Sequence, residues 1–360
     1  MTRNRQIWIW LGVLVAVLFM IYVINDILLP FLVGIAIAYF LDPVADRLER
    51  QGCSRAVATG IISVAFFATA AMVLILLYPL VQDQMIAFFH KIPALVEALT
   101  KRIEPITADL RRAFPVARME ELQDAGKSFI GTAASWFGRV MQGLWAGGLA
   151  LFNAISIVLI TPIVAFYLLR DWGKITMKVD SWLPREFAPT IRALFIEIDS
   201  IISGFIRGAG TVVLFLATVY AAGLTMIGLD FGLLVGLMAG FLSFIPYVGS
   251  FVGVTLALII ALVQFGDLLH IALVLAVFGF GQAIESFYLT PKLVGEKVGL
   301  HPVWVMFALM VGGLLLGFTG VLLAIPIAAT IGVLVRFFLA QYLMSPLYNG
   351  GSVNSGDKSG

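Results

Sequence analysis

The chain alternates between long apolar runs and short polar segments. A helix that rises about 1.5 Å per residue needs roughly 20 apolar residues to cross a bilayer. Runs of about this length lie at Ile7–Ile24, Ala56–Leu80, Gly143–Leu169, Gly208–Leu229 and Leu268–Leu289. The sequence therefore predicts an all-α, polytopic integral membrane protein surrounded by the lipid bilayer.

Three further apolar runs are too short to span the bilayer alone. They are Ile27–Leu41, Phe231–Ile245 and Val303–Leu316. Each corresponds to about 22 Å of helix, against a hydrocarbon core of about 30 Å. Each is also separated from a second apolar run by only a few residues, such as Pro246–Gly249 or Gly317–Gly320. This pattern is typical of short or broken helical hairpins, which we expect at 231–264 and 303–339.

Basic residues set the expected orientation, because cytoplasmic loops carry an excess of Lys and Arg. The arginines ahead of Ile7 place the N-terminus inside. The segment 231–264 is compatible with one crossing or with a re-entrant pair of helices. The re-entrant pair keeps Lys292, Lys297 and Arg336 on or near the inside. We therefore favour re-entrance and expect both termini to be cytoplasmic.

The segment 81–142 differs in its chemistry. Charged residues of both signs are frequent, and apolar positions recur in steps of three and four residues, as in an amphipathic helix. Pro93, Pro105 and Pro115 are expected to kink or divide it. We predict an external amphipathic helical domain, whose apolar stripe either packs on the membrane part of the same chain or serves self-association.

The rest of the chain divides into three parts. Residues 1–80 are expected to hold N-terminal transmembrane helices, and 143–343 a C-terminal transmembrane transport domain. Within that domain, an apolar stripe over 186–207 is typical of a helix lying at the cytoplasmic interface. The tail 344–360, which is Gly- and Ser-rich over its last stretch, is expected to be disordered.

Composition excludes several classes of protein. Hydrophobic residues make up 61% of the chain and charged residues 12%, whereas about a quarter of a soluble domain is charged. The net charge of +2, spread along the chain, indicates no nucleic-acid partner. One cysteine and three scattered histidines form neither a disulfide nor a metal site. Metalloprotease, hydrolase and Walker sequences are absent, so we expect no enzyme, no cofactor and no self-contained ATP-driven pump.

Glu285 is the first candidate site residue, because it lies toward the end of a long apolar run. It is either an interfacial carboxylate paired with Lys292 or Arg207, or part of a polar site facing a water-filled cavity, since ionisable residues inside membranes usually line pathways. Gln282, three residues earlier on the same helical face, adds a second polar group to the cavity interpretation.

Pro246 interrupts the apolar segment GFLSFIPYVGSFVG. Proline removes a backbone donor and frees a carbonyl, and such groups persist at membrane depth only when protein or water shelters them. The break is either a plain hairpin turn or a substrate or ion site of the kind that broken helices form in transporters. A second glycine-rich break, GGLLLGFTGVLLAIP, favours simple close helix packing.

Several blocks of the sequence resemble one family of bacterial membrane proteins. In chain order these blocks are ILLPFLVGIAIAYFLDPVADRLERQGCSRAVA, IDSIISGFIRG, FLSFIPYVG, LTPKLVGEKVGLHP and GGLLLGFTGVLLAIPIAA. Together they resemble the autoinducer-2 exporter family and cover most of the chain outside the external segment.

The resemblance implies a multi-pass transporter of the bacterial inner membrane that works as a homo-oligomer, with a pentamer as one form. Relatives are associated with export of the quorum-sensing furanone autoinducer-2, or with exchange of sodium or lithium for protons. The positions shared with the family pattern are Asp199, Arg207, Pro246, Tyr247, Gly249, Glu285, Pro291 and Gly295.

The residues are compatible with three functions: export of a neutral solute, exchange of a monovalent cation for a proton, and a role without transport. A neutral polyhydroxylated solute needs hydrogen-bonding groups such as Gln282, Tyr247 and free carbonyls, whereas a monovalent cation needs a carboxylate that exchanges a proton. Glu285 is the main acid within the later spans, and a single acid gives little support for cation exchange. We therefore rank export of a small polar solute first and cation/proton antiport second. A non-transporting scaffold is third. The working hypothesis places the breaks at Pro246 and Gly317 opposite each other, over a cavity containing Glu285 and Gln282.

Overall fold

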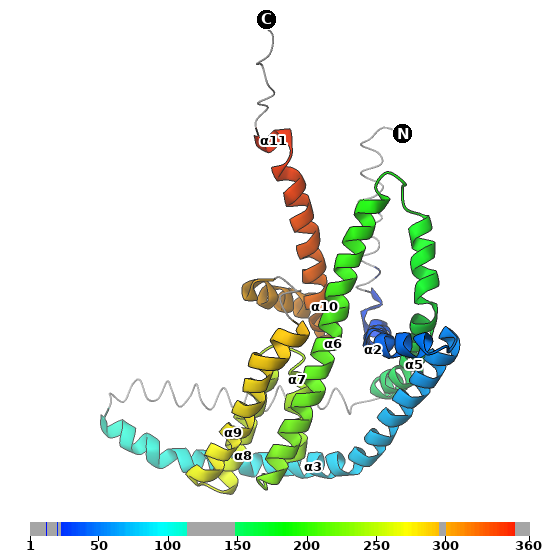
Figure 1. Cartoon of the computed structure of the whole chain (residues 1–360). Helices are drawn as coiled ribbons and strands as arrows, with labels where there is room; N and C mark the ends of the chain where they lie inside the picture. The colour runs from blue at the N-terminus through cyan, green and yellow to red at the C-terminus, as the bar shows by residue number, and fades with distance from the viewer. Residues whose placement is uncertain (1–11, 13–19, 21–22, 114–147, 295–299, 350–360) are drawn as a thin grey trace, which may run out of the picture.

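The computed structural model of the chain describes residues 12, 20, 23–113, 148–294 and 300–349. Several predicted features lie outside the described residues: most of the first span, the second half of the external segment, Gly295, Lys297 and most of the tail. All regular structure within the described ranges is helical (Figure 1). Five of these helices are long and apolar enough to cross a membrane. The predicted all-α, polytopic class is therefore confirmed.

The first described helices form an N-terminal group. They are α2 (Asn25–Arg50), α3 (Arg55–Ala113) and α5 (Gly148–Ser181). The apolar run that begins at Ile27 is short by itself, but α2 continues through the polar residues to Arg50 and so becomes long enough to span. Ala38, Leu41 and Leu169 are in the buried core of this group.

Arg55 fixes the junction of the three helices. Its guanidinium forms ion pairs with Asp42, Asp46 and Glu49 of α2 and donates from Nε to the Leu169 carbonyl of α5 at 3.0 Å. The Arg55 side chain is only 24% exposed. Charge-assisted hydrogen bonds are stronger than neutral ones, so this arginine ties α2, α3 and α5 together at one end of the group.

Helix α3 continues without interruption through Pro93 and Pro105, where the sequence predicted a kink or a division. Its second half runs across the ends of the helices that follow in the chain (Figure 1). Phe88 of its apolar stripe is in their buried core, and Ile92 and Leu95 pack against it. This part of the stripe therefore packs on the membrane part of its own chain.

The C-terminal group is built on α6 (Ala188–Met226), followed by α7 (Gly232–Leu242), α8 (Val248–Gln264), α9 (Leu268–Ile284) and the π-helix η1 (Glu285–Val294). The segment expected to lie at the interface and the next predicted span are one continuous helix, α6 (Figure 1). Leu194 and Ile198 of its first half pack on Ala329 and Val333 of the last long helix, α10 (Pro302–Leu343).

Helices α7 and α8 form a hairpin that leaves and returns at the same end of α6. The Gln264 side chain, at the end of α8, accepts from the Asp230 backbone N–H at 2.7 Å and donates to the Gly228 carbonyl at 2.9 Å. Lys91 of α3 pairs with Asp230 at 2.8 Å at the same end. We call this end the hairpin base and the turn at Ser243–Tyr247 the hairpin tip.

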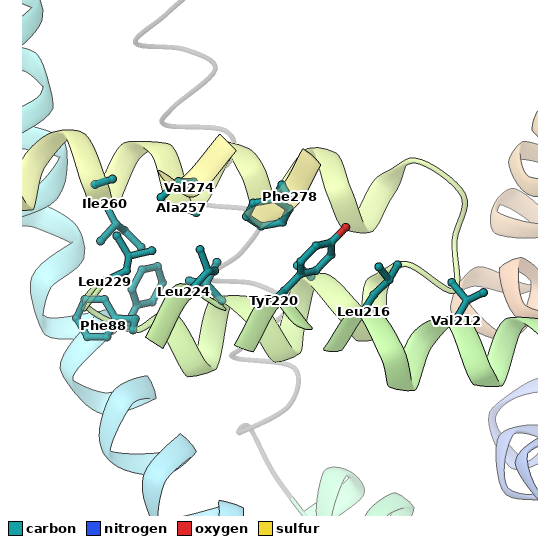
Figure 2. Close-up of a cluster of buried hydrophobic side chains, with 14 of the residues drawn as sticks. Phe88, Val212, Leu216, Tyr220, Leu224, Leu229, Ala257, Ile260, Val274 and Phe278 are labelled. Atoms are coloured by element: carbon teal, nitrogen blue, oxygen red, sulfur yellow. The ribbon is translucent and has the colours of Figure 1, made fainter. Parts of the chain in front are cut away.

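Close backbone contact holds α7 against α6. A Cβ atom added at Gly240 or Gly236 would overlap the backbone of Ala217 or Ala221. The core between these helices is apolar and includes Leu216, Leu224, Val235 and Ile260, as Figure 2 shows for three of them. Only a residue without a side chain permits this approach, so the glycine spacing of the apolar run determines how the hairpin docks.

The last long element, α10 (Pro302–Leu343), contains a break at Gly317, where φ is 58° and ψ is −136°. A non-glycine residue adopts this backbone conformation only with strain, which explains the glycine. The carbonyl groups of Gly312 and Gly320 lie close on either side of the break. Helix α10 packs on α6 and α2, and the short α11 (Pro346–Asn349) follows it.

Candidate functional site

Polar side chains from α8, α9 and η1 are joined by hydrogen bonds near the hairpin tip. Ser250 Oγ donates to Gln282 Oε1 at 2.8 Å, and Gln282 Nε2 donates to Glu285 Oε2 at 3.0 Å and to Ser286 Oγ at 3.4 Å. We call Ser250, Gln282, Glu285 and Ser286 the tip cluster. Since Ser250 is three residues beyond Tyr247, the cluster connects Glu285 to the predicted break at Pro246.

The hairpin tip is a tight, irregular turn. Tyr247 has φ of 68°, in the left-handed region, and its side chain is 72% exposed. A Cβ atom at Gly249 would overlap the Ser243 backbone N–H and the Ala239 carbonyl, which explains the glycine there. Helix α8 begins at Val248, so its free N–H groups and the positive end of its dipole lie beside the tip cluster.

Glu285 is half-buried and begins the π-helix η1, which also contains Pro291. Pro291 lacks a backbone N–H, so it cannot complete a regular α-helical ladder at this point. Isolated π-helical turns within helices occur frequently at functional sites. Pro291 itself is exposed, so its contribution is to the backbone rather than to the cluster.

Glu285 does not form the ion pair that was one of its two expected roles. Lys292 Nζ donates to the Tyr288 hydroxyl at 2.9 Å, and Arg207 Nη2 donates to Ser203 Oγ at 2.9 Å. Within the described residues, the partner found for Glu285 is the amide of Gln282. The carboxylate is therefore held by a neutral group.

A second polar group, formed by Tyr39, Asp199, Ser203 and Arg207, lies where α2 meets α6; we call it the α6 cluster. Tyr39 donates to Asp199 Oδ1 at 2.8 Å. An open pocket beside it, between α2 and α5, includes Tyr39 and Trp172 in its lining. Phe205, between Ser203 and Arg207 in sequence, contacts Phe244 of the hairpin tip with 6.0 Å between ring centroids.

The structure thus gathers the predicted site residues in two places. Gln282 and Glu285 are hydrogen-bonded near the tip that holds Pro246, Tyr247 and Gly249, whereas Asp199 and Arg207 are in the α6 cluster. The break at Gly317 is in α10, which packs on α6 and α2. Within the described residues, no hydrogen bond joins Gly317 to the tip cluster.

Four members of the two clusters, Ser250, Ser286, Tyr39 and Ser203, and the π-helix were not predicted from the sequence. Ser250 is inside the segment that drew attention to Pro246, and its spacing from Tyr247 was the available signal. No signal in the sequence pointed to Tyr39, because its partner Asp199 is 160 residues away. The π-helix had one indicator, Pro291, placed shortly after a long apolar run.

Charged residues beyond the predicted spans have ordinary surface partners. Hydrogen bonds from Arg170 and then Lys174 lower the pKa of Asp171 to about 2. A hydrogen bond from Arg192 likewise lowers the pKa of Asp180. No group of three or more histidine, cysteine or acidic side chains is suited to a metal ion in the part of the chain that the structure describes.

Comparison with known proteins gives matches over most of the chain. A family model described as "AI-2E family transporter" matches residues 11–340. YrrI of Bacillus subtilis (strain 168), named as a transport protein, is 27% identical over 351 residues, covering 93% of this chain and 97% of YrrI. PerM of Escherichia coli (strain K12), named as a permease, is 29% identical over 327 residues, covering 91% of each chain.

Proposed function

Because the chain belongs to the AI-2E transporter family and is a multi-pass membrane transporter of bacterial type, we propose that it exports a small polar solute past the tip cluster. The supporting observation is the hydrogen-bonded set of Ser250, Gln282 and Glu285 between otherwise apolar helices. Polar groups enclosed between apolar helices need a polar partner or water.

The chemistry of the tip cluster favours a neutral, hydroxylated solute. Its members are one carboxylate, one amide and two hydroxyls, which offer both donors and acceptors. The N-terminal end of α8 adds backbone donors suited to an acceptor oxygen. The resemblance to autoinducer-2 exporters makes a hydroxylated furanone the first solute to test.

Liposome transport tests this proposal. Purified protein would be reconstituted and the initial rate of furanone efflux measured. We expect Gln282→Leu, which removes the central side chain and with it the hydrogen bonds to Ser250 and Glu285, to reduce the rate about tenfold, corresponding to about 1.4 kcal/mol. Glu285→Gln keeps a hydrogen-bonding side chain and should retain most of the rate.

Thr218→Val is the matched control for the furanone assay. Among the described residues, the partner of the Thr218 hydroxyl is the Leu214 carbonyl of its own helix, and the variant should transport as the wild type does. Unchanged efflux in Gln282→Leu would contradict the proposed path, and absence of efflux in the wild type would contradict this solute.

Cation/proton antiport is the second candidate function. The observation in its favour is that Glu285 has an amide partner rather than a basic one, so its carboxylate is free to exchange a proton for a cation. An imposed sodium gradient would then move protons in liposomes containing a trapped pH dye, and Glu285→Gln would abolish that movement. If neither assay responds and partner proteins co-purify in a fixed ratio, the third class, a scaffold, is favoured.

The resemblance also implies self-association, and we include a homo-oligomer in the proposal. Native mass spectrometry of the detergent-extracted protein would test it. A single-subunit mass under conditions that preserve transport would contradict this part.

A further inference from the structure

One face of α3 contacts the hairpin base through three side chains. Gln84, Phe88 and Lys91 are spaced by four and then three residues, which places them on the same side of an α-helix. All three meet the start of α7 or the turn just before it. We call these three residues the α3 latch.

Two of the latch residues make polar contacts. Gln84 Oε1 accepts a hydrogen bond from the Leu234 backbone N–H at 3.0 Å, which is one of the N–H groups that the first turn of a helix leaves without a partner. Lys91 Nζ pairs with Asp230 at 2.8 Å and lies 5.5 Å from the centroid of the Phe231 ring. The latch therefore holds both the first turn of α7 and the residues that precede it.

Phe231 is the residue that the latch surrounds. Its ring lies 5.2 Å from the Phe88 ring, measured between centroids, and in Figure 2 Phe88 is at the same end of the apolar core as Leu229 and Ile260. The φ angle of Phe231 is 60°, in the left-handed region. A bulky side chain strains this backbone conformation, which persists only where the surroundings hold it and is common at switch regions.

The boundary between α3 and the hairpin base is weaker than the boundary between the hairpin and α6. The side chains of Lys91 and Asp230 are 55% and 43% exposed, and exposed ion pairs contribute little because water competes for both charges. In contrast, close backbone approach at Gly236 and Gly240 fixes α7 to α6, and two hydrogen bonds from Gln264 close the hairpin. Separation at this end is therefore expected between α3 and the hairpin.

We propose that the α3 latch releases the hairpin base and closes on it again during each transport cycle. Release withdraws the Phe88 ring and the Lys91 ammonium from Phe231, whose backbone then leaves the left-handed region and changes the direction in which α7 begins. Because α8 runs from the tip to the base, this change moves the tip cluster. The inference rests on the proposed solute path, since it assigns control of that path to α3.

Cross-linking across the latch tests the inference, because a permanent brace would have the same contacts but would never open. In a Cys53→Ser background, Lys91→Cys and Asp230→Cys would be joined by a bifunctional thiosulfonate. We expect the link to abolish furanone efflux from liposomes and reduction of the link to restore it. A monofunctional thiosulfonate modifies the same two cysteines without joining them, and this matched control should keep transporting.

Hydrogen exchange gives a second readout that needs no solute. Release of α3 exposes the first turn of α7 to solvent, so the link should slow backbone exchange over 229–235 relative to the monofunctional control. Exchange in α2 should not change. Gln84→Cys with Leu234→Cys is a second pair across the same boundary, and it serves if the first pair does not fold.

Two results would overturn the latch. One is a linked protein that exports furanone at the rate of the monofunctional control, which would make α3 a permanent brace. The other is equal exchange over 229–235 in the linked and control proteins. If the wild type moves no furanone, the proposed function fails by itself, and exchange alone then decides whether the latch opens.

Discussion

At the scale of residues, hydrogen bonds between neighbouring side chains fix the orientation of the tip cluster. Gln282 uses both ends of its amide, toward Ser250 and toward Glu285. The sequence indicated Gln282 and Glu285, because polar residues stand out in an apolar run. It did not indicate Ser250, since a lone serine in an apolar segment is ordinary and its importance comes from a partner distant in the chain, Gln282.

Gly281 and Gly279 both lie on α9 but differ in the space around them, so their alanine substitutions can be compared directly. A Cβ at Gly281 would overlap the Tyr220 ring, whereas one at Gly279 meets no atom within 4 Å. Gly281→Ala should destabilise the protein by about 1–3 kcal/mol through overpacking, whereas Gly279→Ala should be neutral or stabilising by up to about 1 kcal/mol through helix propensity. Thermal or denaturant unfolding in detergent would measure both. Equal effects of the two substitutions would show that the Tyr220 contact is not as described.

At the scale of elements, the hairpin of α7 and α8 is the feature that positions the site. The proline and the run lengths predicted that the apolar segment would break near Pro246, which is where the turn lies. The sequence did not predict how the hairpin closes, because the bonds from Gln264 to Asp230 and Gly228 join positions more than thirty residues apart. The sequence also allowed a division of α3 at Pro93, which does not occur; Phe88, Ile92 and Leu95 pack there on the hairpin helices, and such packing can outweigh local propensity.

Gln264→Leu tests the hairpin base. The substitution keeps the side-chain size but removes two hydrogen bonds, which contribute about 1 kcal/mol each. We expect faster backbone hydrogen exchange in α7 and in the adjoining loops, with α2 unchanged. Thr218→Val, which loses only a bond within its own helix, is the control. Exchange that stays at the wild-type rate in α7 would show that Gln264 does not hold the base.

At the scale of the whole molecule, run lengths predicted the helical spans, because hydrophobic matching to a bilayer is a property of composition. The way in which the N-terminal and C-terminal groups join depends on contacts between residues far apart in the sequence, and the lengths of the apolar runs do not reveal these contacts. Examples are Lys91 with Asp230 and Tyr39 with Asp199. Membrane orientation rests on the distribution of Lys and Arg and remains a prediction.

Single-cysteine labelling tests the orientation, because the chain contains one cysteine, Cys53. In a Cys53→Ser background, Leu268→Cys lies near the hairpin base at a site that is 84% exposed. It should react with an impermeant maleimide in intact cells. Lys178→Cys, exposed near the end of α5, should react only after permeabilisation. The opposite pattern would reverse the predicted topology.

A transport path at the hairpin tip requires that water reaches the tip cluster, and cysteine reactivity measures this access. In the Cys53→Ser background, the rate of reaction with a small charged thiosulfonate would be compared for Ser250→Cys and for Leu275→Cys, an exposed apolar position within α9. We expect Ser250→Cys to react much faster than Leu275→Cys, and hydroxyfuranone to slow the reaction of Ser250→Cys. A Ser250→Cys protein as unreactive as Leu275→Cys, while Leu268→Cys reacts readily, would contradict a polar path at the hairpin tip.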